Sequence, residues 1–586
     1  MNKENLTAYE VVTEENLTDI HSTGWLLRHK KTGARVMLIE NDDENKVFNI
    51  AFRTPPKDST GVAHILEHSV LCGSREFPLK DPFVELVKGS LNTFLNAMTY
   101  PDKTCYPVAS CNDKDFQNLM HVYLDAVFYP NIYKREEIFR QEGWNYHLEQ
   151  KEGPLKYNGV VYNEMKGAFS SPDEVLEREI MNHLFPDTTY GCESGGDPKN
   201  IPDLTYENFL NFHRTYYHPS NSYIYLYGNM DMEEKLAFLD EHYLSHFDYL
   251  DVDSVIQEQK AFGACQDVTL EYPVAENEGE EDNTYLSYNM VVGNAADSQM
   301  AMAFEVLDYA LLSAPGAPLK QALLDVKAGK DVYGSYDDGI LQPYFTVIAK
   351  GSNPDRKEEF VSVIRQVLGD IVKNGIDRKA VEAGINYFEF RYREADFSSY
   401  PKGLMYSLDI LGDWLYEKGN PFAQVQQLTV FEKLKKAVNE GYFEELIRKY
   451  LLENPHGCIM TLVPKKGLAA QREKELEEKL EAYRSSLSEE QLDAMVEKTK
   501  ALEAYQEAGE DPKALECIPM LKRSDIKREA AKIINEELMV NDSLFLYHDV
   551  CTNGIGYVDL MFKTDSIAPE QIPYLGLLKS VLGYVD

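Results

Sequence analysis

The feature that most constrains the fold is an order of elements that occurs three times along the chain. A strand, a loop and a helix are predicted over residues 47–71, again over residues 283–312, and a third time over residues 556–582. Copies at so wide a spacing predict duplicated domains. A chain of 586 residues is also too long for a single hydrophobic core. The sequence therefore predicts several related units in series.

Each unit is expected to combine antiparallel strands with covering helices. Short apolar segments bounded by turn residues predict successive strands, at 25–29, 34–39, 47–52, 91–99, 104–109 and 222–227. Apolar residues at helical spacing predict helices, at 115–128, 164–184, 206–216 and 233–244. This mixture defines the α+β class. We expect a catalytic α+β unit at residues 1–250 and a second unit at 265–465.

Charged residues with helical spacing follow the second unit. Residues 466–535 are rich in Glu, Lys, Ala, Leu and Arg, which is typical of a solvated helical connector, and residues 509–512 predict a break between two helices. The third unit, 536–586, ends just after its first helix. Because a unit of the earlier size needs about two hundred more residues, we expect the chain to be an N-terminal fragment of a longer protein.

Two histidines lie one helical turn apart in the first copy. The segment His64-Ile65-Leu66-Glu67-His68 belongs to an apolar helix that Ser59 or Thr60 can cap. Residues four apart share a helix face, so His64 and His68 can present nitrogens to one point beside Glu67. Two neutral imidazoles and a nearby carboxylate base are what a catalytic zinc requires. The alternative is a pair of core histidines. The second copy has no such pair, so only the first can hold metal.

A catalytic zinc has three protein ligands, so a third must come from elsewhere in the chain. The best candidate is Glu164, in an apolar strand that we expect to pass into a helix at 159–169, with Glu164 on its first turn. An acid there could instead simply favour the helix dipole. Glu174, Glu177 and Glu179 are rivals, and one of them could orient a histidine from a second layer.

Composition narrows the range of partners and compartments. The chain has 59 Lys and Arg against 97 Asp and Glu, a net charge of −38, which disfavours nucleic-acid binding. The eight cysteines form no Cys-x-x-Cys pair and are expected to be reduced thiols. The N-terminus shows no leader pattern, and no apolar run is long enough to span a bilayer. We therefore expect a soluble, cytoplasmic protein without a membrane partner.

Several motifs together resemble one peptidase family. These are His64-x-x-Glu67-His68, Cys72-Gly73-Ser74, the segments 91–97, 160–167, 194–198 and 217–221, and the segments 548–550 and 552–554. They are similar to the pitrilysin/insulinase metallopeptidases, and most similar to the presequence-protease branch. The His-x-x-Glu-His order is that of the inverzincins.

The resemblance implies the site and the architecture of that family. It implies Zn²⁺ bound by His64, His68 and Glu164, with Glu67 as the general base that activates the metal-bound water. It implies that Asn96, Ala97, Met98 and Thr99 lie on an edge strand that binds substrate. It further implies four units closing around a chamber, of which this chain lacks the C-terminal half. The expected function is a zinc-dependent endopeptidase that degrades short unstructured peptides.

Two other functions remain open at this point. The chain could be a non-catalytic peptide-binding or scaffold homologue, although the intact His-x-x-Glu-His and Glu164 argue against this. It could also bind zinc yet hydrolyse little, because an Arg and a Tyr that the family draws from its fourth unit would be missing.

Overall fold

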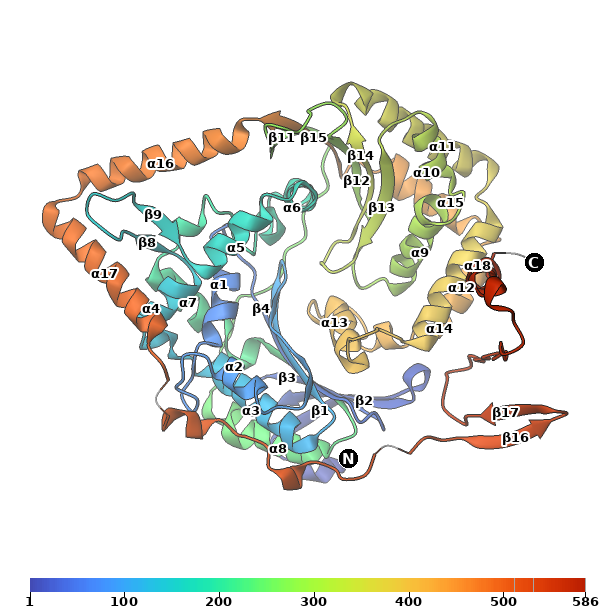
Figure 1. Ribbon diagram of the computed structural model, residues 1–586, viewed down its shortest axis with the longest axis horizontal. Coiled ribbons are helices and arrows are strands. Elements are labelled where there is room, and N and C mark those ends of the chain that lie inside the picture. Colours follow the sequence, from blue (N-terminus) through green and yellow to red (C-terminus); the bar gives the residue numbers. More distant parts are fainter. Residues whose placement is uncertain (511, 531, 585–586) are drawn as a thin grey trace. The chain divides into compact units, whose positions relative to one another are not determined.

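The computed structural model describes residues 1–510, 512–530 and 532–584 (Figure 1). The chain forms two compact units, Met1–Lys532 and Ile533–Asp586, and each is described by itself. The larger unit holds two large sheets with helices packed against them. The expected α+β class with duplicated units is therefore confirmed. The exact domain boundaries drawn from the sequence stay predictions.

The first sheet has eight strands. Their order is β1 (Tyr9–Leu17), β2 (Ser22–His29), β3 (Arg35–Glu40), β10 (Ser222–Gly228), β4 (Lys46–Arg53), β7 (Lys103–Ser110) and β5 (Asn92–Leu95), and β6 (Met98–Thr99) also pairs with β7. The strands β3 and β4 follow each other in the chain but are not neighbours in the sheet, because β10 lies between them, parallel to β3 and antiparallel to β4. All residues of β10 are buried, which suits a central strand.

The second sheet has five strands and repeats the order of the first from β3 onward. It runs β11 (Gln266–Val274), β15 (Gly457–Lys466), β12 (Thr284–Val291), β14 (Tyr344–Ser352) and β13 (Asp331–Asp337). β15 is parallel to β11 and antiparallel to β12, as β10 is to β3 and β4. By this correspondence, the edge strand β13 occupies the place that β5 and β6 hold in the first sheet.

Helices cover both faces of the first sheet. One face packs on helices α1 (Val62–Val70), α3 (Asp113–Phe128), α4 (Glu136–Glu142), α5 (Val160–Ala168), α7 (Tyr206–Tyr216) and α8 (Met232–His242). The other face packs on α13 (Lys402–Trp414), which comes from much later in the chain. Because both faces are covered, β4 and β7 are buried along their whole length.

The second sheet has its own helical layer. It consists of α9 (Ser298–Asp308), α10 (Pro318–Asp325), α11 (Lys357–Asn374), α12 (Arg378–Glu394), α14 (Leu428–Ala437) and α15 (Tyr442–Leu446). The opposite face packs on α6 (Pro172–Leu184), which precedes this sheet in the chain. Figure 1 shows α6 between α5 and the strand β12.

Two expectations around α5 and α6 are wrong. The helix expected at 164–184 is two helices, because α5 ends at Ala168 and Ser171 caps a new helix that begins with Pro172. The strand expected before Glu164 is already helix from Val160 onward. Valine favours strands, but here Val161 is buried in the helical layer, and packing overrides that preference.

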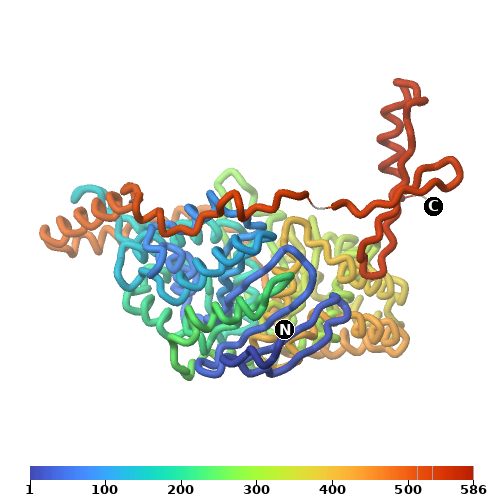
Figure 2. The backbone as a smooth tube through the Cα atoms, turned by 90° about the horizontal axis from the view of Figure 1, so that it is seen from below, coloured from blue at the N-terminus to red at the C-terminus, as the bar shows by residue number. Residues whose placement is uncertain are grey.

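The connector begins as a helical hairpin. Its helices are α16 (Leu468–Ser486) and α17 (Glu489–Glu507), joined where Ser488 forms a capping box with Gln491. The break expected at 509–512 lies beyond the end of α17, and Asp511 is outside the described residues. Residues 512–530 then run along the layer of helices on the first sheet (Figure 2). Ile518 is buried in the core of that layer, and the Pro519 carbonyl accepts a hydrogen bond from the Asn118 side chain.

The smaller unit contains β16 (Glu536–Val540), β17 (Ser543–Tyr547) and α18 (Ile572–Val581). The strand expected at 556–562 does not form, and those residues pair with neither β16 nor β17. Within the described part of the whole chain, none of the helices combines the length and apolar character needed to cross a bilayer.

His213 on α7 gives the fold a specific dependence on pH. Its Nε2 atom lies 2.9 Å from the Val127 carbonyl and its Nδ1 atom 2.7 Å from the Tyr133 hydroxyl, a complete set of partners for neutral imidazole. Burial lowers the pKa of His213 from 6.5 to about 4. The unfolded chain binds this proton more readily, so stability falls as pH falls below about 6.5.

We expect this group to lower the free energy of unfolding by about 2 kcal/mol between pH 7 and pH 5. Urea unfolding at the two pH values measures the effect. In His213→Gln, which cannot titrate, the loss over the same interval should be smaller by that amount. Equal losses in both proteins would contradict the prediction.

Candidate active site

Helix α1 presents both histidines of the motif on one face. Its buried face places Ile65, Leu66 and Val70 in the first core. The rings of His64 and His68 lie 4.9 Å apart, and one ligand atom from each of His64, Glu67 and His68 falls within 4.8 Å of the others. Elsewhere among the described residues, no three His, Cys, Asp or Glu side chains come this close together.

Glu164 approaches both histidines from α5. Its Oε2 atom lies 3.8 Å from His64 Nε2 and 3.7 Å from His68 Nε2. Ligands on a tetrahedral zinc are separated by about 3.3 Å, so these three atoms need little movement to share an ion. Glu164 lies on the second turn of α5, not the first as expected. The rivals Glu174, Glu177 and Glu179 all lie on α6.

The other nitrogen of each histidine is held by a fixed acceptor. His64 Nδ1 lies 3.1 Å from the Gly195 carbonyl, and His68 Nδ1 lies 3.3 Å from Glu142 Oε2. With the proton on Nδ1, each Nε2 lone pair is free to bind metal. The donor set and its orientation therefore fit a divalent zinc ion.

The acid that orients His68 is Glu142, at the end of α4. The alternative that Glu174, Glu177 or Glu179 orients a histidine is not seen, since none of them contacts either histidine in the described structure. Burial alone would lower the pKa of His68, but the hydrogen bond to Glu142 and the charges of nearby acids raise it. The same hydrogen bond lowers the pKa of Glu142 against the effect of its own burial.

Glu67 is buried on α1 and held by the predicted edge strand. The Thr99 hydroxyl donates a 3.0 Å hydrogen bond to Glu67 Oε2. Only Met98 and Thr99 form β6, whereas Asn96 and Ala97 lie in the gap between β5 and β6. A hollow of about 470 Å³ is lined by His64, Glu67, His68, Glu164, Asn96, Ala97, Met98, Thr99 and Tyr100. All eight residues predicted from the sequence thus meet at one place, together with Tyr100, which was not predicted.

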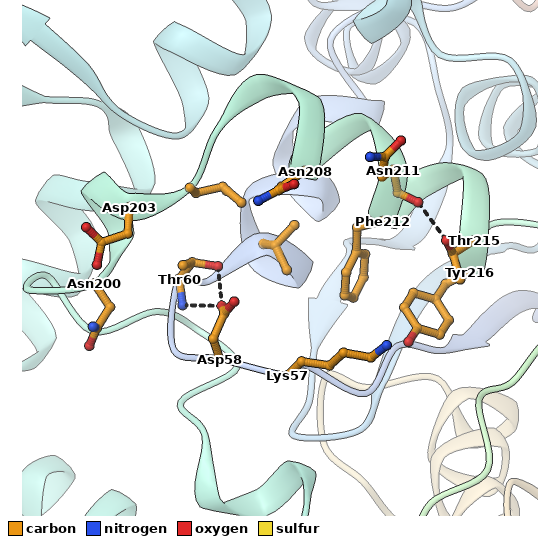
Figure 3. A pocket seen from close by; sticks show the side chains of 12 residues that line it. Lys57, Asp58, Thr60, Asn200, Asp203, Asn208, Asn211, Phe212, Thr215 and Tyr216 are labelled. Atoms are coloured by element: carbon orange, nitrogen blue, oxygen red, sulfur yellow. Dashed lines mark hydrogen bonds between the residues drawn. The ribbon is translucent and has the colours of Figure 1, made fainter.

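The start of α1 differs from the expected cap. Neither Ser59 nor Thr60 caps the helix; the N-cap is Gly61, with φ of 69°. Thr60 instead donates from its amide and its hydroxyl to Asp58, beside a surface hollow between residues 57–62 and α7 (Figure 3). A Cβ on Gly61 would lie 2.7 Å from the Gly195 carbonyl oxygen. Position 61 therefore requires glycine, because the loop whose Gly195 carbonyl binds His64 passes directly over the start of α1.

Gly61→Ala is expected to push that loop away from His64 and weaken zinc binding about tenfold, as loss of an outer ligand contact does. Gly441→Ala is the matched control, because Gly441 also caps a helix with positive φ but has open space around its Cβ position. Both variants carry the same backbone strain, and only Gly61→Ala should change zinc affinity measured by competition with a chelator. Equal affinities would contradict the prediction.

Comparison with known proteins identifies the class. Two family models, "Insulinase (Peptidase family M16)" and "Peptidase M16 inactive domain", match residues 52–190 and 203–388. A third model, for an associated region of the same peptidase family, matches residues 462–586. The first match contains His64, Glu67, His68 and Glu164. The chain belongs to the M16 family of insulinase-like and pitrilysin-like peptidases.

Individual relatives refine this assignment. Protein HypA of Clostridium perfringens is 50% identical over 98% of this chain and 59% of its own length. Presequence protease 1 of Arabidopsis thaliana is 41% identical over 97% of this chain and 53% of its own. The mitochondrial presequence protease of Xenopus laevis is 33% identical over 99% and 56%. The chain thus spans somewhat more than half the length of these relatives. The matches run along nearly all of this chain, and the expectation of an N-terminal fragment stays a prediction.

Solved structures share the fold. A protease from Helicobacter pylori has a TM-score of 0.57 at 16% identity, covering 78% of this chain and 99% of its own. Pitrilysin has a TM-score of 0.54 at 16% identity, covering 78% of this chain and 47% of its own. At such identities the likeness concerns the architecture of duplicated units alone.

Proposed function

We propose that this chain is a zinc-dependent endopeptidase that cleaves short unstructured peptides. The observation that carries the proposal is the convergence of His64 Nε2, His68 Nε2 and Glu164 Oε2 beside Glu67. Homology to presequence proteases supports the same class of substrate.

His64, His68 and Glu164 would hold the ion. When bound, zinc supplies Lewis acidity, which polarises a carbonyl and lowers the pKa of a coordinated water. The Gly195 carbonyl and Glu142 hold the Nδ1 proton of each imidazole, so that Nε2 is the atom of each histidine that would bind the ion.

Glu67 would move the proton during hydrolysis. Its carboxylate accepts the proton that the attacking water loses, and later donates it to the leaving amine nitrogen. The hydrogen bond from Thr99 occupies Oε2 and fixes the carboxylate, which leaves Oε1 as the atom that receives the proton. Thr99 would thus contribute to catalysis through its side chain as well as through its strand.

The peptide would bind along β6 as an additional strand. β6 pairs with β7 on one side, and its other side adjoins the hollow that contains the motif residues. Main-chain hydrogen bonds to residues 96–99 would hold many sequences with little preference. We propose no nucleic-acid or membrane partner, a cytoplasmic location, and completion of an enclosed chamber by a C-terminal half like that of the longer relatives.

A non-catalytic peptide-binding function is the second candidate. It is favoured by the match of residues 203–388 to a domain described as inactive. A chain that binds zinc but hydrolyses peptides only weakly is a variant of this second candidate.

The test uses the full chain, stripped of metal and then supplied with zinc. We expect one equivalent of zinc to restore cleavage of a disordered fluorogenic peptide, and a folded protein to resist cleavage. Zinc and peptide binding without cleavage would favour the non-catalytic function. Failure to bind zinc would overturn the proposal.

A further inference from the structure

Helix α6 lies between the two sheet units and contacts both. Its apolar side chains Leu176, Ile180 and Leu184 are buried in a cluster with residues of β12, β14 and β15. At its first turn, Lys350 of β14 lies 2.9 and 2.8 Å from the two carboxylate oxygens of Asp173. The helix is therefore packed into the second sheet although it precedes that sheet in the chain.

The opposite side of α6 reaches toward the metal site through Arg178. Its Nε atom lies 2.9 Å from Glu193 Oε2, and its guanidinium carbon lies 4.7 Å from the centre of the Phe169 ring. Phe169 is the C-cap residue of α5, and α5 carries Glu164. One guanidinium group thus contacts the helix that supplies the carboxylate ligand.

Glu193 connects the same guanidinium group to the histidine. Its Oε1 atom accepts a 2.9 Å hydrogen bond from the Gly195 amide, while the Gly195 carbonyl accepts from His64 Nδ1. Glu193 is almost completely buried, so the position of this carboxylate depends on Arg178. Loss of the guanidinium would leave this buried charge with the Gly195 amide but without its cationic partner, and the loop would be held less firmly.

We propose that Arg178 and Glu193 are positioning residues that set the distance between His64 and Glu164, and that α6 ties this distance to the second sheet unit. The inference rests on the proposed function insofar as a metal binds at these residues. Through this connection the second sheet unit would help to position the metal ligands. Among its described residues it has no group of metal ligands of its own. Zinc tolerates deviations of only about 0.2 Å in its ligand distances, so a support of this kind has a measurable effect.

The test measures zinc affinity of the full chain by competition with a chelator, and the visible absorption spectrum after loading with cobalt. Arg178→Met is expected to weaken zinc binding about 10- to 100-fold and to alter the cobalt spectrum. Arg178→Lys keeps the charge but not the planar fork, and should restore part of the affinity. Arg448→Met removes an exposed ion pair with Glu445 and Glu453 in the second unit, and should leave both readouts unchanged.

Glu193→Gln provides a second variant in case Arg178→Met does not fold. It keeps an acceptor for the Gly195 amide but removes one of the two carboxylates that pair with Arg178, the other being Glu174, so we expect a loss of several-fold. The double variant should be no weaker than Arg178→Met, because both residues act through one connection. Asp173→Asn, which loosens α6 from Lys350, should weaken binding by a smaller factor.

The outcomes separate this inference from the proposed function. If the parent chain binds zinc through His64 and His68 but Arg178→Met and Glu193→Gln bind it equally well with the same cobalt spectrum, the positioning inference is wrong. Additive losses in the double variant would also contradict it. If the parent chain binds no zinc, the proposed function itself fails.

Discussion

Glu67→Gln is expected to abolish peptide hydrolysis while zinc still binds. Glutamine has nearly the same shape and can keep its oxygen on the Thr99 hydroxyl, but it cannot accept the proton of the attacking water. General base catalysis contributes about 10²- to 10⁴-fold to rates. We therefore expect the turnover number for a disordered peptide to fall by this factor, with the zinc content unchanged.

The control for this experiment is Glu207→Gln, which makes the same chemical change on the exposed side of α7. It should leave turnover and zinc content at the parent values. Undiminished turnover in Glu67→Gln would show that another group takes the proton. Loss of zinc from Glu67→Gln would instead show that Glu67 is a ligand, a possibility that its closeness to both histidines raises.

The sequence allowed the first layer of the site to be predicted because that layer depends on local geometry. A spacing of four residues places His64 and His68 on one face of any helix, whatever surrounds it. Glu164 could not be derived from the spacing of the histidines, since it lies on another helix. We expected that helix to begin too late, with Glu164 on its first turn, because the two valines before Glu164 favour strands. Its approach to both histidines is a property of the packed helices.

The second layer could not be predicted from spacing. Glu142 lies 74 residues from His68, and Gly195 lies 131 residues from His64. Nothing in the residues around Glu142 distinguishes it from the other acids of this acidic chain. For Gly195, the pair Gly195-Gly196 was a visible sign of close backbone approach, but the partner, Gly61, could be recognised only in the folded chain.

The same limit applies to the sheets. Strand residues were recognisable from their apolar runs, and the repeated order of elements predicted two related units. The insertion of β10 between β3 and β4 could not be derived from local pattern, because a parallel pairing joins residues almost two hundred positions apart. The packing of α6 against the later sheet is equally non-local.

Glu164→Ala is expected to remove the third ligand and most of the zinc affinity. Zinc bound by about four protein ligands gains roughly 10–16 kcal/mol, so losing one ligand should cost about 3 kcal/mol, on the order of a hundredfold or more in Kd. Zinc content after dialysis against a weak chelator, together with a Kd from competition, measures the loss. Glu164→Gln keeps the size of the side chain but replaces the carboxylate by a poorer ligand, and should fall between Ala and the parent.

Glu177→Ala is the matched control, because Glu177 is a rival candidate of the same residue type that lies exposed on the neighbouring helix α6. Its zinc affinity should stay within about twofold of the parent, a change far smaller than loss of a ligand produces. If Glu164→Ala retained full affinity while Glu177→Ala lost it, the ligand set would be wrong. If both retained it, Glu164 would not be a ligand, and Glu67, the other carboxylate close to both histidines, would be the third ligand instead.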